Sequence, residues 1–128
     1  MIIPFKERFV EPILNGSKIH TIRADRPNRW RMGKHIHFAT GARTKNYNCF
    51  KTGRCYCVQK INIEWKHLNK AVVRIDDKIF GIYENQNRFD YQLQELANND
   101  GFNRMSDFFD FFNVDFEGKI IHWTNFKY

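Results

Sequence analysis

The spacing of apolar residues switches late in this chain from the strand type to the helix type, and the switch limits the folds that it can adopt. Over 55–65 nearly every second side chain is apolar, as in a strand with one buried face. Beyond residue 90 apolar residues recur three or four positions apart, as in Leu93, Leu96 and Ala97, which is the spacing of an amphipathic helix. Strands followed by a late pair of helices predict an α+β fold.

The same two spacings predict the other elements. Strands are expected over 18–23, 34–39, 71–75, 78–83 and 118–126, with Asp76 and Asp77 as a hairpin turn. Helices are expected over 5–14, from the cap Asp90 to 98–99, and from the cap Asn103 over 104–112. Pro12 makes the first helix short or kinked, and 41–53 is expected to be a long polar loop or a hairpin tip. We therefore predict a small β-barrel or a strongly curved mixed sheet of five to six strands, flanked by an N-terminal helix and a late helical pair.

No linker or repeat divides the chain, so residues 1–128 are expected to form a single domain. No uncharged apolar stretch approaches the ~20 residues that a membrane span needs. Lys6, Glu7 and Arg8 fall where a secretory signal would be apolar, and three cysteines, an odd number, do not suit a disulfide framework. We therefore expect a cytoplasmic protein without a membrane partner, and the sequence makes no prediction about its oligomeric state.

The positive charge of the chain is concentrated in its first part. The net charge is +7, but residues 1–78 hold 17 basic and 6 acidic side chains, whereas 79–128 hold 4 basic and 8 acidic ones. Between Lys18 and Arg54 there are ten basic residues and a single acid, Asp25. So few interspersed acids favour a polyanionic partner such as RNA over an ordinary solvated surface.

The histidines and cysteines do not form a recognisable metal motif. His35 and His37 precede Cys49, Cys55 and Cys57, but the spacings match no common zinc module. Cys55 and Cys57 share one face of the expected strand, where a cysteine acts as a small apolar residue. No metal site and no cofactor are therefore predicted.

A G-x-K-x-x-T-x-R string at 16–23 carries residue types that suit a binding site. On an ideal strand Thr21 and Arg23 share one face and Lys18 lies on the other, so a bend before the strand is needed to bring the three together. Together they would offer an ammonium, a hydroxyl and a guanidinium that can bind phosphate in a bidentate way. The alternative is an edge strand with ordinary surface residues.

This string resembles the signature of the ASCH domain family, and other short motifs of the chain occur in the matching order. They are FVEPIL at 9–14, WRMG at 30–33, DGFN at 100–103 and DFF at 107–109. The resemblance implies a PUA-like fold, a small β-barrel flanked by helices, with a cleft for RNA, a nucleotide or a modified nucleoside. Some small bacterial members hydrolyse acetylated cytidine with a lysine and a threonine of the string and a downstream glutamate. The matching residues here are Lys18, Thr21 and Asp100, an aspartate in place of the glutamate.

Two functions from different classes follow. The first is an RNA- or nucleotide-binding domain with a basic cleft around the string. An unpaired base would stack on Trp30, Tyr47 or Phe50, although Trp30 could instead be a hydrophobic plug between loop and barrel. The residues expected to contact phosphate are Arg23, Arg26, Arg29, Arg31, Lys34, Arg43 and Lys45.

The second function is an amidohydrolase that acts on an acylated nucleoside such as acetylcytidine. Asp100 would position or deprotonate the nucleophile, and Thr21 or a water molecule would attack the amide carbonyl. Lys18 with Arg23 would stabilise the oxyanion. A third use, a protein-interaction surface on the phenylalanine-rich helix, requires an exposed Phe111.

Overall fold

The computed structural model describes residues 1–67, 69–84 and 89–128. Over these ranges the strands are β1 (Ile2–Pro4), β2 (His20–Arg23), β3 (His35–Thr40), β4 (Asn48–Arg54), β5 (Cys57–Lys66), β6 (Lys70–Ile75), β7 (Lys78–Glu84) and β8 (Phe116–His122). The helices are α1 (Val10–Asn15), α2 (Tyr91–Asn99) and α3 (Met105–Phe111), with the 3-10 turn η1 (Glu7–Phe9) before α1. No helix in these ranges is long and apolar enough to cross a membrane. The α+β class expected from the sequence is confirmed.

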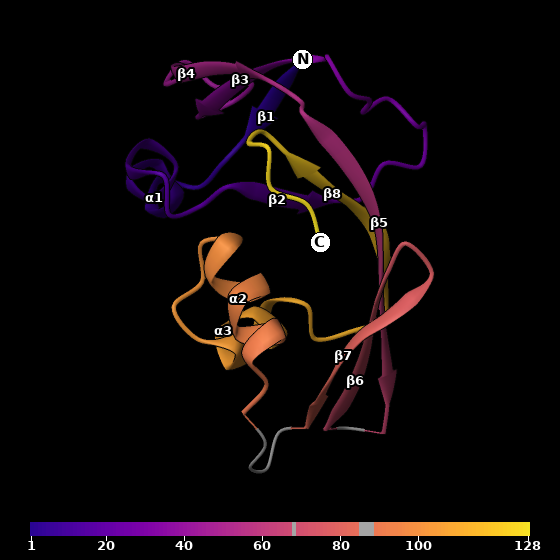
Figure 1. Cartoon of the computed structure of the whole chain (residues 1–128). Coiled ribbons are helices and arrows are strands. Elements are labelled where there is room, and N and C mark those ends of the chain that lie inside the picture. Colours follow the sequence, from indigo (N-terminus) through magenta and orange to yellow (C-terminus); the bar gives the residue numbers. More distant parts are fainter. Residues whose placement is uncertain (68, 85–88) are drawn as a thin grey trace.

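The strands form two sheets, neither of which closes on itself over the described residues (Figure 1). One has three strands in the order β1-β3-β4, and the other has five in the order β2-β8-β5-β6-β7. Two open sheets with eight strands thus replace the five- or six-stranded barrel or single curved sheet that the sequence predicted. Figure 1 shows α2 and α3 side by side against the large sheet, where their apolar side chains complete the main core.

β5 is the central strand of the large sheet and has the pattern that the sequence showed most clearly. It pairs antiparallel with β8 on one side and with β6 on the other. Gln59, Ile61 and Ile63 are buried at alternate positions, as expected. β6 and β7 are joined at Asp76 and Asp77, whose φ angles of 52° and 68° suit a two-residue hairpin turn.

α2 and α3 begin close to the predicted positions, but their first turns are capped differently. The carboxylate of Asp90 accepts a hydrogen bond from the backbone N–H of Leu93 at 3.0 Å, so this cap is confirmed. α3 has no side-chain cap of its own. Instead, the backbone N–H of Met105 donates to the amide oxygen of Gln94 at 3.2 Å. The prediction that Asn103 caps α3 is therefore wrong, because a side chain of α2 fills that role.

β1 and β4 were not predicted, for different reasons. β1 has three residues, too few to show a period, and it pairs parallel with β3. β4 occupies much of the stretch expected to be a polar loop or hairpin tip, and it pairs antiparallel with β3. Its side chains are exposed or half-buried because it is an edge strand, so it has no buried apolar row for a sequence pattern to detect.

Trp30 belongs to a second core cluster next to the three-stranded sheet. Its side chain is 8% exposed and is buried together with Ile36 and Phe38. Asp25 organises the loop around it by accepting hydrogen bonds from the backbone N–H groups of Arg29 and Trp30, each at 2.9 Å. Trp30 is thus buried as a hydrophobic plug would be, and little of its ring is accessible to a base.

His122, at the end of β8, is a fully buried polar residue. Its Nε2 lies 3.0 Å from the amide oxygen of Gln59, while its Nδ1 has no hydrogen-bond partner among the described residues. Because that oxygen can only accept, we assign the proton of a neutral ring to Nε2. Burial, and secondarily the neighbouring His20, lowers the pKa of His122 to about 3.

Acid is therefore expected to destabilise the fold. In the unfolded chain residue 122 has the ordinary histidine pKa of 6.5, so it takes up a proton between pH 7 and pH 5 that the folded state does not bind. The free energy of unfolding should fall by about 2 kcal/mol over this interval because of His122 alone. Urea denaturation of the wild type and of His122→Phe at both pH values measures the effect. The loss should be smaller in the variant by that amount, and equal losses in the two proteins would contradict the prediction.

Candidate functional site

A pocket of about 440 Å³ opens where the two core clusters meet, beside β2. Phenylalanines supply most of its apolar lining: Phe5, Phe9, Phe102, Phe111, Phe112 and Phe116. Its polar lining includes Lys18, Thr21, Arg23 and Asp100. The pocket thus brings together the residues to which the ASCH resemblance gives a catalytic role, in a volume typical of small-molecule sites.

Lys18 and Asp100 form a buried ion pair in the pocket wall. Nζ of Lys18 donates to the backbone oxygen of Asp100 at 2.6 Å and to its Oδ1 at 3.1 Å, and the two side chains are 2% and 5% exposed. Burial lowers the pKa of Lys18, and the negative charge of Asp100 opposes that effect. The ammonium also lies 4.8 Å from the ring centroid of Phe9 and 5.8 Å from that of Phe5, within cation–π range.

The backbone before β2 provides the bend that the string requires. Gly16 ends α1 with a φ of 86°, a left-handed conformation that glycine adopts without strain. The backbone N–H of Lys18 donates to the Pro12 carbonyl, and that of Ile19 donates to the Asn99 carbonyl, both at 2.9 Å. The second bond joins the start of β2 to the end of α2. Lys18 therefore meets the residue that follows α2, although the two are 82 positions apart.

Thr21 and Arg23 share one face of β2, as their spacing predicts. Nε of Arg23 donates to Thr21 Oγ1 at 3.1 Å, and Nη2 donates to the Pro4 carbonyl at 2.6 Å. The guanidinium also lies 5.1 Å from the ring centroid of Phe5. Burial lowers the pKa of Arg23, and Asp100 opposes that effect. Because Thr21 Oγ1 accepts the bond from Arg23, its hydroxyl proton remains available to a ligand.

His20 and Tyr128 join the site without having been predicted. His20 is fully buried, with Nδ1 3.3 Å from Asp100 Oδ1 and Nε2 2.6 Å from the Tyr128 hydroxyl. Burial lowers the pKa of His20, against the attraction of Asp100. The sequence held a signal for His20, because it shares strand parity with Lys18 and both contact Asp100. A lone ring such as Tyr128, far along the chain, offers no comparable signal.

Most of the residues predicted to contact phosphate lie outside the pocket. Arg23 lines it, whereas the others are exposed in two segments. The loop before β3 carries Arg26, Arg29, Arg31 and Lys34, and the turn after β3 carries Arg43 and Lys45. β3 has six residues, so its two ends are about 17 Å apart. The exposed cations thus flank β3 at opposite ends, rather than gathering around the string as the sequence suggested.

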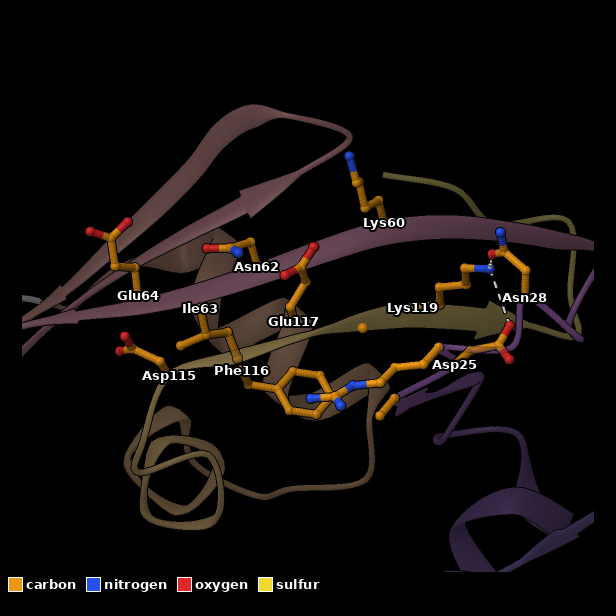
Figure 2. A pocket seen from close by; sticks show the side chains of 13 residues that line it. Asp25, Asn28, Lys60, Asn62, Ile63, Glu64, Asp115, Phe116, Glu117 and Lys119 are labelled. Atoms are coloured by element: carbon orange, nitrogen blue, oxygen red, sulfur yellow. Dashed lines mark hydrogen bonds and ion pairs between the residues drawn. The ribbon is translucent and has the colours of Figure 1, made fainter.

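A second, polar hollow of about 790 Å³ lies beside the pocket, and Phe116 lines both. Figure 2 shows side chains of both charges in this hollow, namely Lys60, Glu64, Asp115, Glu117 and Lys119. Nζ of Lys119 donates to Asp25 Oδ2 at 3.1 Å and also contacts Asn28 Oδ1. Burial alone would raise the pKa of Asp25, but the N–H groups of Trp30 and Arg29 and the ammonium of Lys119 hold it below the usual value. The hollow therefore offers no uniformly positive surface to a phosphate chain.

The cysteines do not contribute to the pocket. Cys49, Cys55 and Cys57 are free thiols, and burial raises the pKa of Cys55 to about 11, so that thiol remains protonated. Across 1–67, 69–84 and 89–128 no group of three or more His, Cys, Asp and Glu residues is placed to hold a metal ion. The chemistry of the candidate site therefore rests on Lys18 and Asp100 with their neighbours.

Gly101 shapes the turn that presents Asp100, and this position should not tolerate a side chain. Its φ is 94°, and a Cβ there would lie 2.9 Å from a ring carbon of Phe9 and 3.0 Å from Cδ of Lys18. Gly101→Ala should lower the free energy of unfolding by about 2 to 4 kcal/mol, from backbone strain and crowding together. The matched control is Gly33→Ala, at a φ of 89° with nothing within 4 Å, which should cost only about 1 to 2 kcal/mol. Urea denaturation compares the variants, and equal losses would exclude a crowding effect at residue 101.

Comparison of the chain with models of known protein families finds no match, and comparisons with curated proteins and with solved structures find none either. A function for the pocket is therefore inferred from its chemistry and from the short motifs that resemble the ASCH family.

Proposed function

We propose that the protein is an ASCH-like domain that binds RNA, a nucleotide or a modified nucleoside, with one base held in the phenylalanine-lined pocket. The observation that supports this proposal is the meeting of Lys18, Thr21 and Arg23 with the distant Asp100. The string and the acid belong to separate motifs that resemble the same family. The likeness to the family that we propose concerns the residues of this site and not the whole fold. Over the described residues the two sheets do not close into the barrel of a PUA-like domain.

The lining of the pocket suits a flat heterocycle. Rings such as Phe5 and Phe9 can stack on a base, and one such stack contributes about 1 to 3 kcal/mol. Lys18 donates hydrogen bonds and the carboxylate of Asp100 accepts them, so the edge of a base can be recognised by both kinds of group. A volume of about 440 Å³ admits a nucleoside but no folded RNA, so an RNA would insert one unpaired nucleotide.

The exposed cations would extend this contact along an RNA backbone. Arg26, Arg29, Arg31 and Lys34 follow β2 directly, so a strand that leaves the pocket past Arg23 would meet their loop. The polar hollow of Figure 2 is a poorer path, because the carboxylates of Glu64 and Glu117 repel phosphate. We therefore expect the backbone to follow the loop before β3.

Binding should be salt-dependent and sensitive to that loop. Fluorescence anisotropy with a short single-stranded RNA should give an affinity that falls as salt rises. Arg29→Ala combined with Arg31→Ala should weaken binding and reduce the slope of log Kd against log salt by about 1.4, the value for two lost phosphate contacts on a single strand. The control removes two exposed charges elsewhere, with Lys66→Ala and Lys70→Ala at the β5–β6 turn. Equal effects of the two double variants, or no salt-sensitive binding at micromolar protein, would contradict the proposal.

Amide hydrolysis of an acylated nucleoside is the second candidate function, and the buried Lys18–Asp100 pair beside Thr21 favours it. Asp100 would position or deprotonate the nucleophile, which is the Thr21 hydroxyl or a water molecule. The nucleophile gives its proton to Asp100 and attacks the amide carbon, and Lys18 with Arg23 stabilises the resulting oxyanion. The bond from carbon to the base nitrogen breaks as Asp100 passes that proton to the nitrogen. Where Thr21 is the nucleophile, a water molecule then hydrolyses the acetyl ester and frees the threonine. Hydrolysis of acetylcytidine in this way consumes one water molecule and yields acetate and cytidine.

Chromatography of acetylcytidine incubated with the protein tests the second function. The wild type should convert it to cytidine, and Asp100→Asn should lower kcat by about 10²- to 10⁴-fold because it removes the acid–base group. Lys18→Ala should also lower kcat strongly, since the oxyanion loses a donor. Lys60→Ala, an exposed change outside the pocket, serves as the control and should leave turnover unaltered. Absence of turnover in the wild type, or an active Lys18→Ala variant, would reject hydrolysis of this substrate and leave nucleotide binding to be judged on its own.

A further inference from the structure

His20 is linked to the pocket through a chain of buried and half-buried side chains. Nδ2 of Asn99 lies 3.0 Å from the Tyr128 hydroxyl, that hydroxyl lies 2.6 Å from His20 Nε2, and His20 Nδ1 lies 3.3 Å from Asp100 Oδ1. Asp100 lines the pocket, but His20 does not. The imidazole is therefore joined to the pocket by its hydrogen bond to the carboxylate of Asp100.

The partners determine the direction of these hydrogen bonds. The Asn99 amide nitrogen can only donate, so the Tyr128 oxygen accepts from it and directs its own proton to His20 Nε2. Nε2 is then the unprotonated nitrogen, and the ring proton belongs to Nδ1, which donates to Asp100. The assigned state is a neutral imidazole that acts as a donor to the carboxylate.

The two oxygens of Asp100 have different surroundings. Oδ1 accepts from both Lys18 and His20, whereas no described residue donates to Oδ2. Over the described residues, His122 Nδ1 is the only fully buried side-chain nitrogen or oxygen that lacks a hydrogen-bond partner. Asp100 Oδ2 has no donor either, so it is not fully buried. The oxygen that His20 and Lys18 leave unused therefore keeps some exposed surface, and the residue that carries it lines the pocket.

We propose that His20 is a positioning residue that orients Asp100, so that Oδ1 stays bonded to Lys18 while Oδ2 faces the bound base. This inference rests on the proposed function, and it narrows the ligand. A carboxylate oxygen fixed in this way accepts a hydrogen bond from an exocyclic N–H, so between the pyrimidines it favours cytidine or an acylated cytidine over uridine, which has a keto oxygen at that position. His20 thus supports discrimination of the base without touching it.

Matched variants separate positioning from packing. His20→Asn keeps an amide N–H near the place of Nδ1 and can still donate to Asp100, whereas His20→Leu fills the space without a donor. Tyr128→Phe keeps the ring and removes the hydroxyl that directs the proton of His20. Titration calorimetry with cytidine and with uridine is the first readout. His20→Leu should lose about tenfold in cytidine affinity with little change for uridine, and His20→Asn should retain most of the preference.

Nitrogen NMR of the imidazole is the second readout and does not depend on any ligand. The wild-type His20 should show the neutral Nδ1–H form, and Tyr128→Phe should shift the ring toward the other tautomer. The carboxyl carbon resonance of Asp100 should move in His20→Leu and remain near its wild-type position in His20→Asn. A folded His20→Leu variant that keeps the cytidine preference would overturn the proposal, as would a wild-type ring protonated on Nε2. If the wild type binds neither these nucleosides nor single-stranded RNA, the proposed function fails, and the NMR results alone decide whether His20 orients Asp100.

Discussion

The contact between Lys18 and Asp100 joins parts of the chain that are otherwise distant, and the candidate site is arranged around it. Removing two charges from water costs more than their mutual attraction returns unless further polar partners are present. Here the Asp100 backbone oxygen, the rings of Phe5 and Phe9, and the imidazole of His20 supply them. Replacing a buried ion pair by an apolar pair of similar size often costs no stability. Stability alone is therefore a weak explanation for the two charges.

The sequence predicted those parts of the molecule in which local pattern and burial coincide. β5 alternates because one of its faces packs on the helices, and Asp90 caps α2 because an aspartate before the first turn accepts a backbone N–H that the helix itself leaves unpaired. The sequence showed that a bend before Lys18 is needed to bring it to Thr21 and Arg23. It could not show the backbone hydrogen bond from Ile19 to Asn99, because the two residues are far apart in the chain. Prediction failed for Tyr128, whose role depends on such a distant partner, and for the edge strand β4, which has no buried apolar row. His20 shares strand parity with Lys18, but the sequence does not show that Asp100 lies beside both.

The phenylalanines of the pocket also belong to the packing of the protein. Phe9 packs against both core clusters, and Phe102 and Phe112 are buried members of the main one while they line the pocket. Phe111 is 53% exposed, as the protein-interaction alternative requires, and it also lines the same pocket. A ligand would thus contact rings that are already held in place by the cores. Such rigid walls favour recognition of one shape of base over adaptation to many.

His20 and His122 are direct partners across the β2–β8 ladder, with ring centroids 5.3 Å apart. His20 is hydrogen-bonded to Asp100, whereas His122 belongs to the interior. Burial lowers the pKa of both rings and so favours their neutral form. A proton on either ring would place a positive charge against the other ring and near Lys18. Acidification therefore acts on the site and on the interior together. The carboxylate of Asp100 can be studied separately by substitution, whereas acidification would change the site and the native structure at the same time.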